Sequence, residues 1–101
     1  MKLLKIIKEM LSDMGGLKID NKPIRIVKYS PTSKFQIALI NPENRLVTAT
    51  FGTQFPNEKQ AEKFLCDNLP KIEEYFMQED ILEEGIEGRF EIIDKEIKCD
   101  I

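Results

Sequence analysis

The sequence contains no histidine and no tryptophan, and only five glycines. Histidine is the commonest general base, nucleophile activator and transition-metal ligand, so its absence excludes Ser-His-Asp triads, Cys-His pairs and histidine-bearing zinc sites. The glycines are too scattered to form a phosphate-binding loop or a dinucleotide fingerprint, which need closely spaced glycines at a strand-to-helix turn. We therefore predict a protein that is not an enzyme and that needs neither a metal nor a cofactor.

Cysteine is scarce, and long apolar runs are missing. Cys66 and Cys99 show no paired spacing, so we interpret both as reduced thiols of a cytoplasmic protein. The basic opening of the chain is interrupted by Lys5 and Lys8, which is not typical of a signal peptide. No stretch approaches the roughly 18 apolar residues that a membrane-spanning helix needs. We expect a cytoplasmic location and no membrane partner.

The length of 101 residues, with 42% hydrophobic and 33% charged residues, is typical of one globular domain with one core. Apolar residues recur at helical spacing between Leu3 and Met14, and Gly15 and Gly16 then end the predicted helix. A meander of three antiparallel strands follows, and its strands are predicted at residues 23–29, 34–40 and 45–51.

Asn57 is a good N-cap for a second helical region. Pro70 either kinks that helix or stands in the first turn of a second helix, which should end near residues 78–80. Alternating apolar residues within 89–101 suggest a last strand. The predicted fold is a single α+β domain spanning residues 1–101, with the order α-β-β-β-α(α)-β.

Alternation along the meander divides its side chains between two faces. The face toward the helices is predicted to carry Ile24, Ile26, Phe35, Ile37, Leu39, Val47, Ala49 and Phe51. The outer face would carry Arg25, Val27, Tyr29, Gln36, Ala38, Ile40, Leu46, Thr48 and Thr50, a mixture too apolar to be left in water. The C-terminal segment or an error in register could account for it. A partner or a homodimer through this outer face is the alternative.

Charge is distributed unevenly along the chain. Residues 1–56 contain nine basic and four acidic residues, whereas residues 57–101 contain six basic and fourteen acidic residues. The acidic run within residues 73–87 supplies the candidate partner-binding residues Glu73, Glu74, Asp80, Glu83, Glu84 and Glu87. If residues 72–87 formed one helix, Glu73, Asp80, Glu84 and Glu87 would share one stripe. A face that only keeps the protein soluble is the alternative.

Residues 51–65 (FGTQFPNEKQAEKFL), which close the meander, resemble the strand-to-helix junction of the arm-binding domains of phage integrases. That resemblance implies a three-stranded sheet that reads DNA. The order of helix, meander and helix is also similar to double-stranded-RNA-binding domains, although their lysine cluster is replaced here by Asn57-Glu58-Lys59. These resemblances favour a nucleic-acid-binding sheet as the second hypothesis, with Arg25, Lys28, Lys34 and Arg45 as its contacts.

The layout is also similar to small acidic inhibitor proteins of phages and mobile elements, including some anti-CRISPR proteins. Their acidic surfaces imitate a nucleic-acid backbone and occupy a basic groove. We therefore favour a non-enzymatic protein-interaction module, an inhibitor or accessory protein of phage or bacterial origin. It would act through its acidic C-terminal half on a basic, nucleic-acid-binding protein. Direct binding of nucleic acid is the less favoured alternative.

Overall fold

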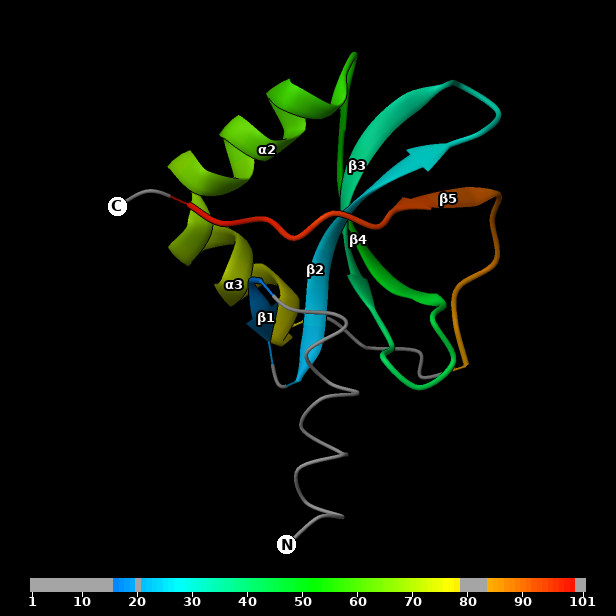
Figure 1. Cartoon of the computed structure of the whole chain (residues 1–101), viewed down its shortest axis with the longest axis horizontal. Helices are drawn as coiled ribbons and strands as arrows, with labels where there is room; N and C mark the ends of the chain where they lie inside the picture. The colour runs from blue at the N-terminus through cyan, green and yellow to red at the C-terminus, as the bar shows by residue number, and fades with distance from the viewer. Residues whose placement is uncertain (1–15, 20, 79–83, 100–101) are drawn as a thin grey trace, which may run out of the picture.

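The computed structural model describes residues 16–19, 21–78 and 84–99. Two helices pack on one face of a five-stranded antiparallel sheet, so the mixed α+β class predicted from the sequence is confirmed. Figure 1 shows the helices on one side of the molecule and the curved sheet on the other. The helix predicted for residues 1–14 lies outside the described residues. The described part of the chain begins instead with a short strand, which the sequence did not indicate.

The predicted meander is present as β2 (Lys22–Tyr29), β3 (Lys34–Ile40) and β4 (Val47–Phe55). The turn between β3 and β4 is held by asparagine side chains. Asn41 Oδ1 accepts from the Glu43 amide at 2.8 Å, and Asn44 Oδ1 accepts from the Leu46 amide at 3.0 Å. Such local bonds replace the ladder bonds that a turn loses. Strand β4 therefore begins two residues later than predicted, and it runs on to Phe55.

The second edge of β2 is shared by two short strands. β1 (Lys18–Ile19) pairs with the start of β2, and β5 (Phe90–Ile93) pairs with its end, from Ile26 to Tyr29. Between them, the Ile24 amide donates to the Leu17 carbonyl at 2.8 Å. The sequence could not predict β1, because two residues carry no periodicity. The predicted last strand is real but covers only β5, and the residues after it are irregular.

Two consecutive helices follow the meander: α2 (Glu58–Asp67) and α3 (Leu69–Gln78). Asn57 caps α2 as predicted, since its Oδ1 accepts from the Gln60 amide at 2.8 Å. Pro70 is the second residue of α3, where a missing N–H costs no helical hydrogen bond. The structure thus selects two helices over one kinked helix. The described part of α3 reaches Gln78, and residues 79 and 80 of the predicted end lie outside the described residues.

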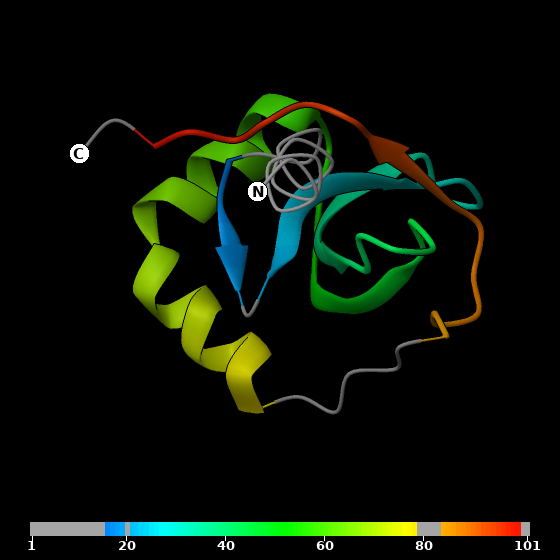
Figure 2. The same cartoon turned by 60° about the horizontal axis from the view of Figure 1, so that its bottom comes forward.

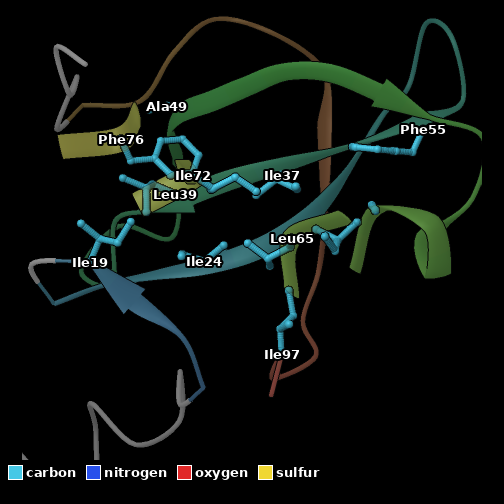
Figure 3. Close-up of a cluster of buried hydrophobic side chains, with 12 residues drawn as sticks. Ile19, Ile24, Ile37, Leu39, Ala49, Phe55, Leu65, Ile72, Phe76 and Ile97 are labelled. Carbon is cyan, nitrogen blue, oxygen red and sulfur yellow. The ribbon is translucent and has the colours of Figure 1, made fainter. Parts of the chain in front are cut away.

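The first hydrophobic cluster lies between the sheet and both helices (Figure 3). Its buried members are Ile19, Ile24, Ile26, Ile37, Leu39, Ala49, Phe55, Ala61, Leu65, Ile72, Phe76 and Ile97. Ile37 is fully buried, as the alternation predicted. Helical spacing from Asn57 predicts Phe64 on the buried face of the second helical region. In the structure Phe64 is only half-buried, because it lies on the flank of α2 against the rings of Phe51 and Phe55.

A second cluster occupies the opposite face of the sheet and consists of Val27, Ala38, Ile40 and Val47. Val47 was predicted on the helix face, and this was wrong. A register irregularity separates the pairs Leu39–Ala49 and Ile40–Val47, so Val47 and Ala49 fall on opposite faces. Ile86, Phe90 and Ile92 pack against this cluster. The C-terminal part of the chain therefore covers the outer face. The predicted homodimer depended on an exposed apolar outer face, and this covering removes that basis.

Cys66 and Cys99 form a disulfide, so the prediction of two free thiols was wrong. The two cysteines are 33 residues apart, and their Cα atoms lie 5.3 Å from each other. Figures 1 and 2 show why: the segment after β5 crosses the molecule and runs alongside α2. Closing a loop of this length stabilises a fold by about 3–4 kcal/mol in the chain-entropy account. Sequence spacing gave no sign of a contact that only the fold creates.

Phenylalanines at two depths of the core should respond differently to truncation. Phe76 is fully buried, so Phe76→Ala should lower the free energy of unfolding by about 3–5 kcal/mol. Phe64→Ala should cost roughly half as much, because part of that ring already contacts water. Urea denaturation of both variants measures the difference. Equal losses would show that the rings of Phe64 and Phe76 are equally buried in solution.

Two glycines should respond in opposite directions to alanine. Gly16 has φ +87°, and an added Cβ would lie 3.0 Å from the Ile97 nitrogen, so Gly16→Ala should destabilise the fold by about 1–3 kcal/mol. At Gly52 an added Cβ meets nothing within 4 Å, and its φ lies outside the left-handed region. Gly52→Ala should therefore stabilise the fold by about 0.4–1 kcal/mol. Thermal melts of the two variants that shift in the same direction would contradict this.

Candidate interaction surfaces

The acidic run is divided by the fold. Glu73 and Glu74 lie on α3, whereas Glu84 and Glu87 lie in the irregular segment before β5. Asp80 and Glu83 are outside the described residues. Because α3 ends at Gln78 and residue 84 is in a turn, no single helix spans residues 72–87. The single helical stripe of four acidic residues therefore does not form.

The two described pairs of acidic residues also belong to opposite layers. Helix α3 packs through Ile72 and Phe76 on the first cluster, while the segment containing Glu84 and Glu87 packs through Ile86 on the second. The Ile86 amide anchors that segment by donating to the Val47 carbonyl at 2.8 Å. Figure 2 shows α3 and this segment on different sides of the sheet. The acidic run thus supplies two surfaces rather than one.

Of the seven other carboxylates that the structure describes, Glu62, Asp67, Asp94 and Glu96 form ion pairs, and Glu43, Glu58 and Glu91 do not. Lys95 pairs with Glu62 at 3.3 Å, Lys63 with Asp67 at 2.7 Å, and Arg45 with Asp94 at 2.8 Å. No described basic side chain pairs with the run, whose described members are Glu73, Glu74, Glu84 and Glu87. All but the half-buried Glu73 are exposed. Their charge is therefore directed toward solvent.

An apolar side chain lies within the acidic surface of α3. Met77 is 75% exposed, and it follows Glu73 by four residues and Glu74 by three, so the three share the outer side of the helix. The sequence did not single out this residue. Helical spacing in the sequence already places Ile72 and Phe76 on the inner side of α3 and Met77 on its outer side. The exposure of Met77 could therefore have been predicted. A flexible thioether among carboxylates suits contact with a partner surface of mixed character.

The basic candidates for nucleic-acid binding do not gather on one surface. Lys28 and Lys34 lie near the β2–β3 turn and, by strand alternation, project from opposite faces. Arg45 lies at the other end of the sheet, in the β3–β4 turn. Arg25 is only 1% exposed, so it is a core residue and not a surface contact. The alternation that assigned Arg25 to the outer face was correct, but that face is covered.

Arg25 is held in place by groups of the C-terminal segment. Its Nε lies 3.9 Å from Asp94 Oδ1 and makes no hydrogen bond, while Nη1 donates to the Ile24 carbonyl at 3.1 Å. Burial lowers the pKa of Arg25, Asp94 and Glu96 raise it, and Arg45 lowers it; the net shift is downward. The guanidinium stays charged at physiological pH, because arginine keeps its proton at neutral pH in proteins. The fold therefore depends on a nearby carboxylate at Asp94.

Arg45 is the second partner of Asp94. Its Nη2 donates to Asp94 Oδ2 at 2.8 Å, and its backbone has φ +59°, a left-handed conformation uncommon for residues other than glycine. The Arg45 amide donates to the Asn41 carbonyl at 2.8 Å, which fixes the turn. Asp94 thus joins the β3–β4 turn, β2 and the end of β5. The sequence analysis missed Asp94, because nothing in its local pattern distinguishes it from other acidic residues.

An open depression of about 260 Å³ lies along α2 and beside the end of β4. Its lining comprises Phe55, Gln60, Lys63, Phe64 and Asp67. The aromatic rings continue past it, since Phe51 contacts Phe64 at 5.9 Å and Tyr75 at 4.9 Å between ring centroids. The hydrogen bond to Asp67 raises the pKa of Lys63 at the rim. The depression is apolar at its base and has a neutralised rim.

Within residues 16–19, 21–78 and 84–99, no three side chains of the metal-binding types gather to hold an ion. The helices of that same part are neither long nor apolar enough to cross a membrane. Comparisons of the chain with protein families, curated proteins and solved structures find no match. Its function must therefore be argued from its own surfaces.

Removing the carboxylate of Asp94 should destabilise the fold through Arg25. Asp94→Asn leaves a buried guanidinium facing a neutral group, and we expect a loss of about 1–3 kcal/mol of unfolding free energy. Arg25→Met, which removes the charge but keeps the volume, should change stability by less than about 1 kcal/mol. Urea denaturation gives both values.

Asp67→Asn is the matched control, because it removes an equivalent carboxylate from the exposed Lys63–Asp67 pair and should change stability far less. If Asp94→Asn is as stable as Asp67→Asn, then Asp94 does not support the Arg25 charge.

Proposed function

We propose that this chain is a non-enzymatic protein-interaction module that binds a basic partner protein through the acidic residues of α3 and of the segment before β5. The observation that supports this most is the contrast in charge pairing. Glu62, Asp67, Asp94 and Glu96 form ion pairs within the fold, whereas the described acidic residues of residues 73–87 form none with a described basic residue. Glu43, Glu58 and Glu91 are also unpaired among the described residues, but they are scattered, whereas residues 73–87 contain no basic residue at all. Unpaired charges of one sign contribute little to folding, but they accelerate encounter with an oppositely charged surface.

Met77 supports α3 as the stronger of the two surfaces. It offers an apolar contact within the acidic field, and an interface needs an apolar centre as well as complementary charge. A basic nucleic-acid-binding protein is the partner class that this surface suits. An inhibitory or accessory role toward such a protein, in the cytoplasm of a bacterium or of a phage-infected cell, is the context we propose.

The proposal is tested with two charge-neutral variants, one for each surface. Glu73→Gln with Glu74→Gln, and separately Glu84→Gln with Glu87→Gln, should leave the melting temperature nearly unchanged, because like charges on a surface stabilise little. Partners captured from an extract by the wild-type chain are identified by mass spectrometry. Their association rates are then measured with each variant. We expect the α3 pair to slow association by about tenfold and the other pair to slow it less.

Salt should mimic the variants, because surface charges are screened beyond about 8–10 Å at moderate ionic strength. Glu43→Gln with Glu91→Gln is the control, since it removes two acidic charges outside the run. If this control slows association as much as the α3 pair, net charge alone explains the binding. If none of the variants changes binding, the acidic run only keeps the protein soluble.

Nucleic-acid binding through the sheet has no specific observation in its favour, because the basic candidates are buried, paired or separated. A gel shift with duplex and single strands still distinguishes it. Removing Glu73 and Glu74 charges would strengthen binding to phosphates and weaken binding to a basic protein. The two functions therefore predict opposite effects of the same variant.

A further inference from the structure

Among the described residues, few noncovalent contacts attach the C-terminal segment of residues 94–99 to the rest of the fold. The segment forms no helix or strand, and Asp94, Lys95, Glu96 and Lys98 are exposed. Ile97 is its one buried residue, at 3% exposure, and lies at the margin of the first cluster near Leu65 (Figure 3). After Asp94, the packing of this segment on the fold therefore depends mainly on the side chain of Ile97.

Two further contacts join the segment to its neighbours. The Leu17 amide donates to the Ile97 carbonyl over 3.3 Å, and Lys95 Nζ lies 3.3 Å from Glu62 Oε1 on α2. The first is a long hydrogen bond and the second is a surface ion pair, and both are individually weak. The ion pair between Lys98 and Glu96 lies within the segment and fastens it to nothing else. Noncovalent contacts alone would let the segment open readily.

The Cys66–Cys99 disulfide attaches the segment to α2 covalently. Glu62 and Cys66 are one turn apart on the same side of α2, so the ion pair and the disulfide fasten the segment to one strip of that helix. Both cysteines are only partly buried, and a reductant can reach them. The covalent bond is thus placed at the end of a weakly held segment, where breaking it has a local effect.

We propose that the Cys66–Cys99 disulfide is a redox-sensitive clasp, whose reduction releases residues 95–99 from α2 and Leu17 while the rest of the sheet stays folded. This goes beyond the proposed partner binding and does not depend on it. In a reducing cytoplasm, protein disulfides are rare and those that form are mostly transient or redox-sensing. In such a compartment, a partly buried bond at the end of a weakly held segment would open and close with the redox state.

The reductant is a cellular dithiol, and the exchange is balanced. One thiolate of the dithiol attacks a sulfur of the Cys66–Cys99 bond, which forms a mixed disulfide and releases the other cysteine as a thiolate. The second thiol of the reductant then displaces the remaining cysteine. The dithiol leaves as a disulfide, having given two electrons, and the two cysteine thiolates take up its two protons. Release of Ile97 then uncovers the part of the first cluster beneath it.

Hydrogen exchange of the full chain, oxidised and after reduction with dithiothreitol, tests the clasp. Reduction should raise the exchange rate of the Leu17 amide, which donates to Ile97, and of the Lys95 amide, which donates to Ile93, by about tenfold or more. The β2–β3 ladder should keep its protection. The double variant Cys66→Ser with Cys99→Ser should exchange like the reduced wild type, and dithiothreitol should not change it.

Two results would overturn the clasp. Unchanged protection of the Leu17 and Lys95 amides after reduction would mean that noncovalent contacts suffice to hold the segment. Loss of protection throughout β2 and β3 would mean that the bond supports the whole fold. Neither result bears on the acidic surfaces, whose binding is measured separately with the glutamate variants.

Discussion

Hydrogen bonding along both edges of β2 is the constraint on which the rest of the structure depends. β3 occupies one edge, and β1 and β5 divide the other between them. A strand paired on both sides and covered on both faces must be apolar on both faces, and residues 23–27 are all buried. The helices settle on one face of β2, and the segment before β5 settles on the other. Two distant parts of the chain thus meet at one strand.

That arrangement buries one charge, because Arg25 is the one charged residue among the buried residues of β2. A buried guanidinium needs a compensating carboxylate. Asp94 provides it from the residue that follows β5, and Arg45 holds Asp94 from the β3–β4 turn. The end of β5 therefore provides both the carboxylate that compensates Arg25 and the apolar side chains that cover the outer face of the sheet. Of the described residues beyond this point, only Ile97 is buried, and the disulfide fixes the course of the segment along α2.

Surface chemistry in this chain follows from which charges the fold uses. The carboxylates nearest the C-terminal segment form ion pairs. The carboxylates of α3 and of residues 84–87 form no ion pair with a described basic residue. Composition alone made the whole acidic run look like one feature. The fold separates it into a helical surface that includes Met77 and a second surface across the sheet, and this separation makes the two surfaces individually testable.

Much of the fold was determined by the sequence itself. Strand β3, the Asn57 cap, the break at Pro70 and the inward face of Ile24, Ile26 and Ile37 follow from local propensity and periodicity, which short segments carry by themselves. Only tertiary structure decided the rest. The pairing of β1, the side taken by Val47, the burial of Arg25 and the Cys66–Cys99 bond depend on residues far apart in the chain. Periodicity carries no record of such contacts, because they arise only when β2 brings both ends of the chain together.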